Sequence, residues 1–258
     1  MRTAFKNALT TEQVNQYKRD GYLLVSNLFS GDIAEKAEAA MWRLMSMGRD
    51  DPQTWNQIPP EAEYNEARRI VIFNGVTDPD LLACATPEYL FAVAQLVGEG
   101  AQTLHPPQAI HTQNLLPAQL EPSIPHAHVD GIPREHQHKT FPGPYRIASL
   151  VYLSDIEPGG GGTVVWPGSQ KQIRALAESD REKYTYLYDL NKDILSLDLG
   201  EPIELLPKRG DVLFFQHLFG HNGTSNTGSK PRLMMRYFCA CSACARWKKT
   251  DEWNHWTP

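Results

Sequence analysis

The chain has little cysteine and no excess of basic residues. Its 258 residues include four cysteines, 25 lysines and arginines, and 30 aspartates and glutamates, which gives a formal net charge of −5 at pH 7. Four cysteines are too few for the disulfide framework of a secreted protein. The acidic balance excludes the broad basic surface with which proteins bind nucleic acid, so we expect no nucleic-acid partner.

Long apolar segments are also missing. No apolar run approaches the roughly 20 residues that cross a bilayer, and residues 1–13 lack the apolar stretch of a secretory signal. We therefore predict a cytoplasmic protein without a membrane partner. Hydrophobic residues make up 41% of the chain and no linker-like segment interrupts it, so we expect one domain over residues 1–258, as a monomer or a homodimer.

The cysteines themselves favour burial over metal binding. Cys239, Cys241 and Cys244 form a C-x-C-x-x-C pattern that supplies only three thiols and follows an apolar, strand-like run. Free cysteines are among the most frequently buried residues. We expect these three and Cys84 to behave as small hydrophobic residues.

Residues 1–100 are predicted to form a helical layer. Thr10-x-x-Gln13 is a capping box, in which each side chain accepts a backbone N–H of the other residue at a helix start. Asp20-Gly21 should end that helix, because glycine accepts the positive φ beyond a helix end. The predicted elements are a helix over 11–19, a strand over 22–25, a helix over 32–47, a loop over 50–66 and a helix over 87–97.

Residues 101–245 are predicted to form a β core. Short apolar runs alternate there with clusters of Gly, Pro, Asn and Asp, which is typical of an all-β sandwich or barrel. We expect about eight strands, including residues 147–153, 163–166, 203–206, 212–215 and 233–239.

Histidines are concentrated in two places. Four of the nine lie within residues 126–138, and His217 and His221 lie close together later in the chain. In His128-x-Asp130 the two side chains would share one face of an extended strand. Two histidines and one carboxylate on one side of a metal form the site of non-haem Fe(II) oxygenases. His126 competes with His128, and His217 with His221, for the histidine positions.

An arginine follows the second group of histidines in the sequence. Arg232 lies eleven residues beyond His221. Its planar guanidinium can donate two parallel hydrogen bonds to a carboxylate and keeps its charge when buried. Near a metal centre it would hold the far end of a dicarboxylate co-substrate.

Together these segments resemble the phytanoyl-CoA dioxygenase family of Fe(II)/2-oxoglutarate oxygenases. The resemblance rests on His128-Val129-Asp130, on GTVVWPGSQK (162–171), on GDVLFF (210–215) and on the segment from His221 to Arg232. Residues 9–13, 20–23 and 27–29 are similar to the opening helix and strand of that family. The matches run in order from residue 9 to about residue 238.

The resemblance implies a fold, a ligand set and a reaction. The fold would be a double-stranded β-helix, the jelly roll of cupin-like proteins, behind the N-terminal helices. His128, Asp130 and His221 would hold the iron, and Arg232 would pair with the C5 carboxylate of 2-oxoglutarate. With O2, the enzyme would hydroxylate or otherwise oxidise a small-molecule substrate and release succinate and CO2. The presence of Asp130 distinguishes the chain from the halogenating branch.

One departure from the family pattern concerns the co-substrate. Family members often have a small hydroxyl residue two positions after the distal histidine, where this chain has Gly223. Another polar side chain would then assist Arg232, and the candidates are Gln113, Thr112 and Thr163.

The remaining candidates concern the substrate and the function itself. Candidate substrate contacts are His126, Arg134 and Trp166. Two alternative functions are a cupin-like isomerase or hydrolase that uses no 2-oxoglutarate, and a jelly-roll binding module without catalysis. The position of Arg232 argues against the first, and the complete ligand set argues against the second.

Overall fold

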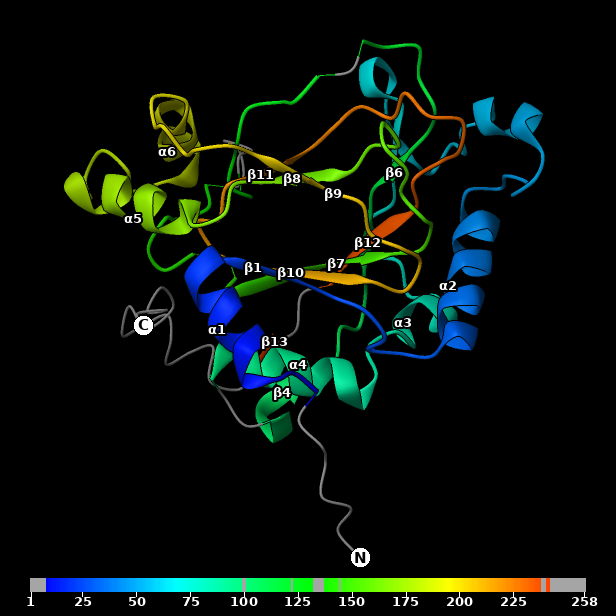
Figure 1. The fold of residues 1–258 in the computed structure, drawn as a ribbon. Coiled ribbons are helices and arrows are strands. Elements are labelled where there is room, and N and C mark those ends of the chain that lie inside the picture. The colour runs from blue at the N-terminus through cyan, green and yellow to red at the C-terminus, as the bar shows by residue number, and fades with distance from the viewer. Residues whose placement is uncertain are drawn as a thin grey trace, which may run out of the picture.

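Two antiparallel sheets face each other in the centre of the protein (Figure 1). The computed structural model describes residues 8–98, 101–121, 123–131, 137–143, 145–237 and 240–241. The larger sheet has the order β1 (Tyr22–Val25), β10 (Val212–Gln216), β7 (Ile147–Tyr152), β12 (Met234–Tyr237) and β5 (His111–Thr112). The smaller sheet has the order β11 (His221–Gly223), β8 (Thr163–Val165) and β9 (Ile203–Leu205). Two sheets of antiparallel strands confirm the mainly β fold class and agree with a jelly roll.

The central strands of the larger sheet are covered on both faces. Every residue of β7 and of β10 is buried, which explains why these runs are apolar almost throughout instead of alternating. On the outer face, Tyr89 of α4 stacks on Phe214 with ring centroids 5.7 Å apart and hydrogen-bonds to Ser149 over 2.6 Å. The other face of the sheet is turned toward the smaller sheet.

The N-terminal α-helices cover the outer face and one end of the larger sheet (Figure 1), and all but the short helix Pro79–Leu82 were predicted. They are α1 (Thr11–Asp20), α2 (Gly31–Leu44), the short α3 (Pro79–Leu82) and α4 (Pro87–Val97). The capping box is confirmed, since the Thr10 hydroxyl accepts the Gln13 N–H at 3.2 Å and the Gln13 side chain accepts the Thr10 N–H at 2.9 Å. The predicted strand over 22–25 is confirmed as β1.

The prediction of a loop over 50–66 is wrong in part. This segment contains a 3-10 helix, η1 (Pro52–Asn56), and a strand, β2 (Glu63–Asn65). It is ordered because Trp55 is buried and stacks on Trp42, with ring centroids 6.2 Å apart. The third sheet has the order β2, β3 (Ile70–Ile72) and β6 (Asn114–Leu115), and η2 (Glu66–Arg68) joins its first two strands.

Two helices in the region of the β core were not predicted. They are α5 (Ser169–Ser179) and α6 (Leu187–Ile194). Both are amphipathic, and Ile173, Leu187 and Leu190 pack with Val164 in a second apolar cluster on the outer side of the smaller sheet. The remaining described elements are η3 (Ala101–Thr103), β4 (Leu104–His105) and β13 (Ala240–Cys241).

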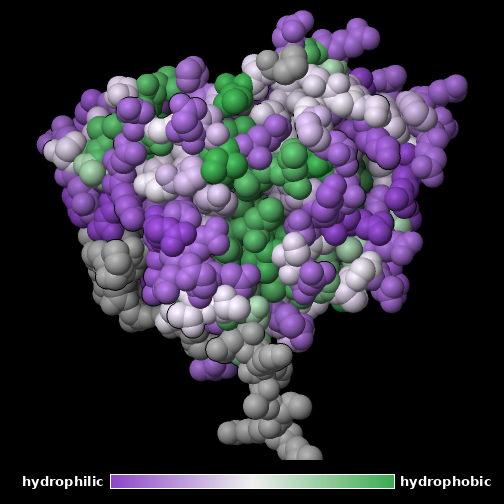
Figure 2. Space-filling view, viewed as in Figure 1, coloured by the Kyte–Doolittle hydropathy of each residue, from purple (hydrophilic) through white to green (hydrophobic). Residues whose placement is uncertain are grey.

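The surface drawn in Figure 2 is mostly hydrophilic, with hydrophobic residues gathered near its middle. Among the large hydrophobic residues exposed in the described part of the chain, Ile203 and Leu206 belong to β9 and the residue after it. None of the helices in the described ranges is long and apolar enough to span a membrane.

The cysteines are only partly described. Cys84 is a buried free thiol, as expected, and burial raises its pKa to about 12. Cys239 and Cys244 lie outside the described residues, and of Cys241 only the backbone is described, as part of β13.

The turn at Gly21 gives a test of how the helical layer is attached. Gly21 ends α1 at φ 84°, and a Cβ placed there would collide with Gln170 of α5 and approach the Phe219 ring to 2.7 Å. Gly98 ends α4 at φ 70° with no atom within 4 Å of such a Cβ. We expect Gly98→Ala to cost about 1 kcal/mol in free energy of unfolding, from the left-handed backbone alone, and Gly21→Ala to cost at least about 1 kcal/mol more.

Urea unfolding followed by circular dichroism measures both values. Equal losses for the two variants would contradict the close packing of the α1 turn against α5.

Candidate metal centre and co-substrate site

Two histidines far apart in the sequence are joined through their backbones. His128 donates its N–H to the carbonyl of His221 and accepts the His221 N–H in return, both over 3.0 Å. The segment around His128 thereby extends the smaller sheet beyond β11. Residues that exchange both hydrogen bonds in an antiparallel pair lie directly opposite each other, and the two imidazole centroids are 4.7 Å apart.

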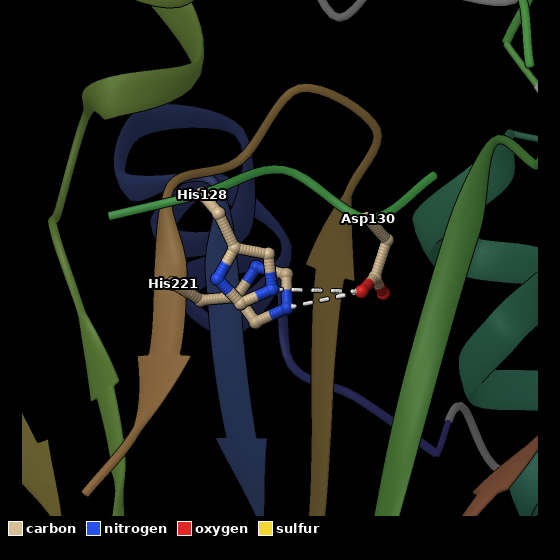
Figure 3. Close-up of side chains that lie close together, drawn as sticks. All are labelled: His128, Asp130 and His221. Carbon is tan, nitrogen blue, oxygen red and sulfur yellow. Dashed lines mark ion pairs between the residues drawn. The ribbon is translucent and has the colours of Figure 1, made fainter. Parts of the chain in front are cut away.

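Asp130 completes a group of three side chains that fits one metal ion. It lies two residues beyond His128 in an extended segment, so the two side chains point the same way. The Nε2 atoms of His128 and His221 lie 3.8 and 3.7 Å from Asp130 Oδ1, and Figure 3 shows both rings directed at this carboxylate. All three candidate ligand atoms lie within 4.8 Å of one another.

The protonation of these groups suits a divalent metal. Burial, followed by the positive charge of His221 when protonated, lowers the pKa of His128 to about 3, so its imidazole is neutral and can ligate. Burial alone would raise the pKa of Asp130, but Arg236 and then the two histidines hold it well below its usual range. The Phe219 carbonyl can only accept, so its 3.0 Å contact with Nδ1 of His221 leaves Nε2 of that ring free for a metal.

Asn191 holds the residue between the first two ligands, and no local pattern in the sequence indicates this role. Its Oδ1 accepts the N–H of Val129 at 2.9 Å, and its Nδ2 donates to the Val129 carbonyl at 3.1 Å. The Val129 side chain is buried in the second apolar cluster. Its backbone is therefore fixed from α6, and the flanking side chains of His128 and Asp130 point the opposite way.

His217 does not join this group. Its Nε2 lies 2.9 Å from the carbonyl of Thr140, and its ring packs edge-on against Tyr145 at 5.5 Å. Burial lowers the pKa of His217 to about 4. Of the two competing histidines, the structure brings His221 to His128 and Asp130.

Arg232 is a buried cation on the same side of β11 as His221. Residue 223 follows His221 by two positions on one strand, and a Cβ added to Gly223 would lie 3.5 Å from Arg232 Nη1. The side chain donates to the carbonyls of Gly161 at 2.9 Å and Gln113 at 3.1 Å. Burial lowers the pKa of Arg232 to about 10, so the group remains charged at neutral pH.

This buried charge has no carboxylate partner within the described ranges. Both assigned hydrogen bonds of Arg232 go to neutral carbonyls, and its buried Nε has no partner. Burying a charge without compensation is costly. The buried guanidinium of Arg232 is therefore placed to bind an anion.

The three polar residues predicted to assist Arg232 differ in position. Thr163 faces the interior between the sheets, where its hydroxyl lies 2.6 Å from that of Tyr152. Burial raises the pKa of the Tyr152 phenol to about 12, and the nearby positive charge of Arg232 opposes this rise. Gln113 contributes its backbone carbonyl to Arg232.

Thr112 is not brought to the site. His111 lies opposite Arg236, and Thr112 lies opposite Met235. Opposed residues of a sheet share a face, and neighbours in a strand do not, so Thr112 and Arg236 point to opposite faces. The Thr112 hydroxyl accepts the N–H of Phe73 at 3.1 Å in the core.

Arg236 is a further residue that sequence reasoning missed. Its Nη2 lies 3.4 Å from Asp130 Oδ1. It follows Arg232 by four positions on an extended strand, which places both arginines on one face. The even spacing between Arg232 and Arg236 is the sequence signal that could have indicated a second arginine near the site. The hydroxyl of Tyr145 also contributes a hydrogen bond to Asp130.

The predicted substrate residues lie elsewhere or are not described. Trp166 and His126 line one hollow of about 270 Å³ on the outer side of the smaller sheet, together with Ile124 and residues of α6 and the segment after it. Trp166 packs in the second apolar cluster because it follows Val164 by two positions and so points away from Thr163. Arg134 lies outside the described residues.

Comparisons with known proteins agree with this geometry. Residues 17–234 match the model of the phytanoyl-CoA dioxygenase (PhyH) family. The chain is 27% identical over 238 residues to an ectoine dioxygenase of Bordetella parapertussis, covering 88% of this chain and 74% of that protein. It is 24% identical over 250 residues to one of Stutzerimonas stutzeri, covering 92% of this chain and 79% of that protein.

Solved structures share the fold. The epimerase SnoN, solved with Fe3+, alpha ketoglutarate and nogalamycin RO, has a TM-score of 0.64 at 16% identity, over 90% of this chain and 83% of that one. EctD from S. alaskensis, solved with 2-oxoglutarate and 5-hydroxyectoine, has a TM-score of 0.58 at 15% identity, over 94% of this chain and 80% of that one. These similarities confirm the predicted jelly-roll fold.

The family match covers most of the chain, and the structure assembles a two-histidine, one-carboxylate group with a buried arginine beside it. This chain belongs to the phytanoyl-CoA dioxygenase family and is a 2-oxoglutarate-dependent non-haem iron dioxygenase.

Proposed function

We propose that this enzyme hydroxylates or otherwise oxidises a small-molecule substrate and converts 2-oxoglutarate to succinate and CO2. The observation that supports this most is the guanidinium of Arg232, which is buried without a carboxylate partner among the described residues and lies on the side of β11 that carries His221. Two residues along a strand span about 7 Å, which is comparable to the length of a five-carbon diacid. One end of 2-oxoglutarate would meet the metal and the other would meet Arg232.

The residues of the chain would divide the work as follows. His128, His221 and Asp130 would hold Fe(II) on one side and leave the opposite positions open. Iron bound there supplies the chemistry by which O2 oxidises both the 2-oxo acid and the substrate. Arg232 would orient the co-substrate, and the apolar rings of Phe215 and Phe219 near His221 would exclude water on that side.

The substrate is a small molecule in this proposal. Ectoine, which has a carboxylate, is the first compound to test because the curated relatives are named ectoine dioxygenases. The cytoplasmic location and the monomeric or homodimeric state stay predictions from the sequence.

Succinate formation tests the proposed reaction. Purified protein with Fe(II), 2-oxoglutarate and O2 should release succinate, and a true substrate should increase its rate and be converted in equal amount. Conversion of a substrate without any need for 2-oxoglutarate would favour a cupin-like isomerase or hydrolase instead.

Replacing each competing histidine tests the ligand set. We expect His221→Ala to abolish Fe(II) binding, because it removes one of three ligands, and His217→Ala to leave Fe(II) binding largely intact, because His217 contacts Thr140 instead. Anaerobic equilibrium dialysis with Fe(II) measures both. Loss of binding in His217→Ala alone would show that the assignment is wrong.

Asn191 should affect the affinity for Fe(II) although it is not a metal ligand. Replacing Asn191 with Leu removes both hydrogen bonds to Val129, so the flanking ligands lose their fixed orientation. We expect Fe(II) affinity to fall about tenfold or more, in the range typical of groups that orient metal ligands. Asn74→Leu is the matched control, since the Asn74 side chain donates to Glu63 Oε1 at 2.7 Å and leaves Val129 held. Equal affinities of the two variants would contradict the positioning role.

Arg232 should determine co-substrate affinity. We expect Arg232→Gln to bind Fe(II) normally and to weaken 2-oxoglutarate binding by about tenfold or more, because a charge-assisted hydrogen bond to the carboxylate is lost. Anaerobic titration of the Fe(II)-loaded variant with 2-oxoglutarate, followed by the visible absorption of the chelated 2-oxo acid, gives the dissociation constant. An unchanged constant would disprove the co-substrate role.

A further inference from the structure

The segment that carries two of the three metal-ligand candidates is attached to β11 by a single pair of backbone hydrogen bonds. His128 and His221 exchange these bonds and form an isolated bridge instead of a longer ladder. In an antiparallel pair, the next two residues to exchange hydrogen bonds would be His126 and Gly223. In the described part of the chain, no backbone hydrogen bond joins these two residues. The regular ladder therefore ends after one pair on this side of His128.

The Asn222 side chain takes the place of the missing pair. Its Oδ1 accepts the N–H of Gly223 at 2.8 Å, and its Nδ2 donates to the carbonyl of His126 at 2.6 Å. Residues two apart on a strand direct their backbone groups to the same edge, so the N–H of Gly223 points to the edge at which His221 binds the other segment. A carboxamide offers one acceptor and one donor group. It thus links the two segments where a direct backbone hydrogen bond would otherwise do so.

The two ends of the ligand segment are held in different ways. At one end, Val129 is buried in the second apolar cluster and its backbone is bound by Asn191. At the other end, residues 123–126 are exposed or partly exposed. Burial therefore contributes little there, and the hydrogen bond from Asn222 is the contact that fixes the backbone to β11.

The position of this contact determines which histidine lies opposite His221. His126 precedes His128 by two residues, and a shift of the segment by two residues would leave the faces unchanged. Such a shift would bring His126 opposite His221. The hydrogen bond from Asn222 to the His126 carbonyl is made in the register in which His128 occupies that position.

We propose that Asn222 is a positioning residue for the metal site, because its carboxamide fixes the register of the ligand segment and so places His128 opposite His221. This inference rests on the proposed function, in which His128, Asp130 and His221 hold the iron. Neighbouring residues of a strand point to opposite faces, so the Asn222 side chain leaves β11 on the face away from the metal. It acts on the iron through the segment that it holds.

Replacing Asn222 with Asp isolates the hydrogen bond to His126. Aspartate has the shape of asparagine and can still accept the Gly223 N–H, but a carboxylate cannot donate to a carbonyl. We expect Asn222→Asp to weaken Fe(II) binding about tenfold, as is typical when a group that orients metal ligands is lost. The added negative charge alone would strengthen the binding of a cation, so it cannot cause this loss. Anaerobic equilibrium dialysis of the full-length protein measures the dissociation constant.

A second variant and a matched control accompany this measurement. Asn222→Leu removes both contacts of the side chain and should weaken Fe(II) binding at least as much as Asn222→Asp. Asn15→Asp adds the same charge at an exposed position of α1. It should leave the Fe(II) dissociation constant at the wild-type value.

Two further readouts distinguish positioning from a general loss of stability. The visible absorption band of the Fe(II)-loaded protein with 2-oxoglutarate depends on the ligands of the iron, and we expect its wavelength to shift in Asn222→Asp. The contact between Asn222 and His126 lies at the surface. Metal-free Asn222→Asp should therefore unfold at nearly the same urea concentration as the metal-free wild type.

The outcomes separate this inference from the proposed function. A wild-type protein that binds no Fe(II) would overturn both. Wild-type Fe(II) binding without a 2-oxoglutarate band would overturn the proposed reaction, and the Fe(II) constants would still decide the role of Asn222. Unchanged Fe(II) constants in both Asn222 variants would overturn that role alone. Weaker Fe(II) binding together with an equally weakened metal-free fold would show that Asn222 only supports the structure, and would also overturn it.

Discussion

The two-way backbone hydrogen bond between His128 and His221 is the contact on which the site depends. It joins the segment around His128 to a strand more than ninety residues later, and it sets the two imidazoles side by side. Asp130 then reaches the same point through strand alternation alone. Asn191 holds the intervening Val129 from the other side, so the metal ligands are fixed by backbone geometry and not by contacts among themselves.

The charges of the buried side chains explain which ligands the site suits. Asp130 carries a negative charge next to Arg236, whereas Arg232 is buried without a carboxylate partner among the described residues. A divalent metal beside Asp130 and a dicarboxylate between this metal and Arg232 would balance these buried charges. The arrangement of cations thus favours a diacid, which agrees with the family to which the chain belongs.

Local sequence patterns were sufficient for features that depend on a spacing of two to four residues. His128-x-Asp130 and the Thr10 capping box are of this kind. Thr112 shows where such reasoning fails. Whether residue 112 or its neighbours face the site depends on the register with β12, and a shift of one residue reverses the faces.

Other parts of the site depend on long-range packing, which one sequence does not reveal. Asn191 acts from a helix more than sixty residues after the ligands it supports, and α5 and α6 fold because their apolar faces cover the smaller sheet. Trp166 was predicted to contact the substrate, but it directly follows β8 and its side chain points into that apolar cluster.

The most direct test of this account is a crystal structure of the protein grown without O2 in the presence of Fe(II) and 2-oxoglutarate. We predict one metal ion bound by Nε2 of His128, Nε2 of His221 and an oxygen of Asp130, with 2-oxoglutarate chelating it and its remote carboxylate on Arg232. A metal held by other residues, or a co-substrate carboxylate that makes no contact with Arg232, would contradict the account.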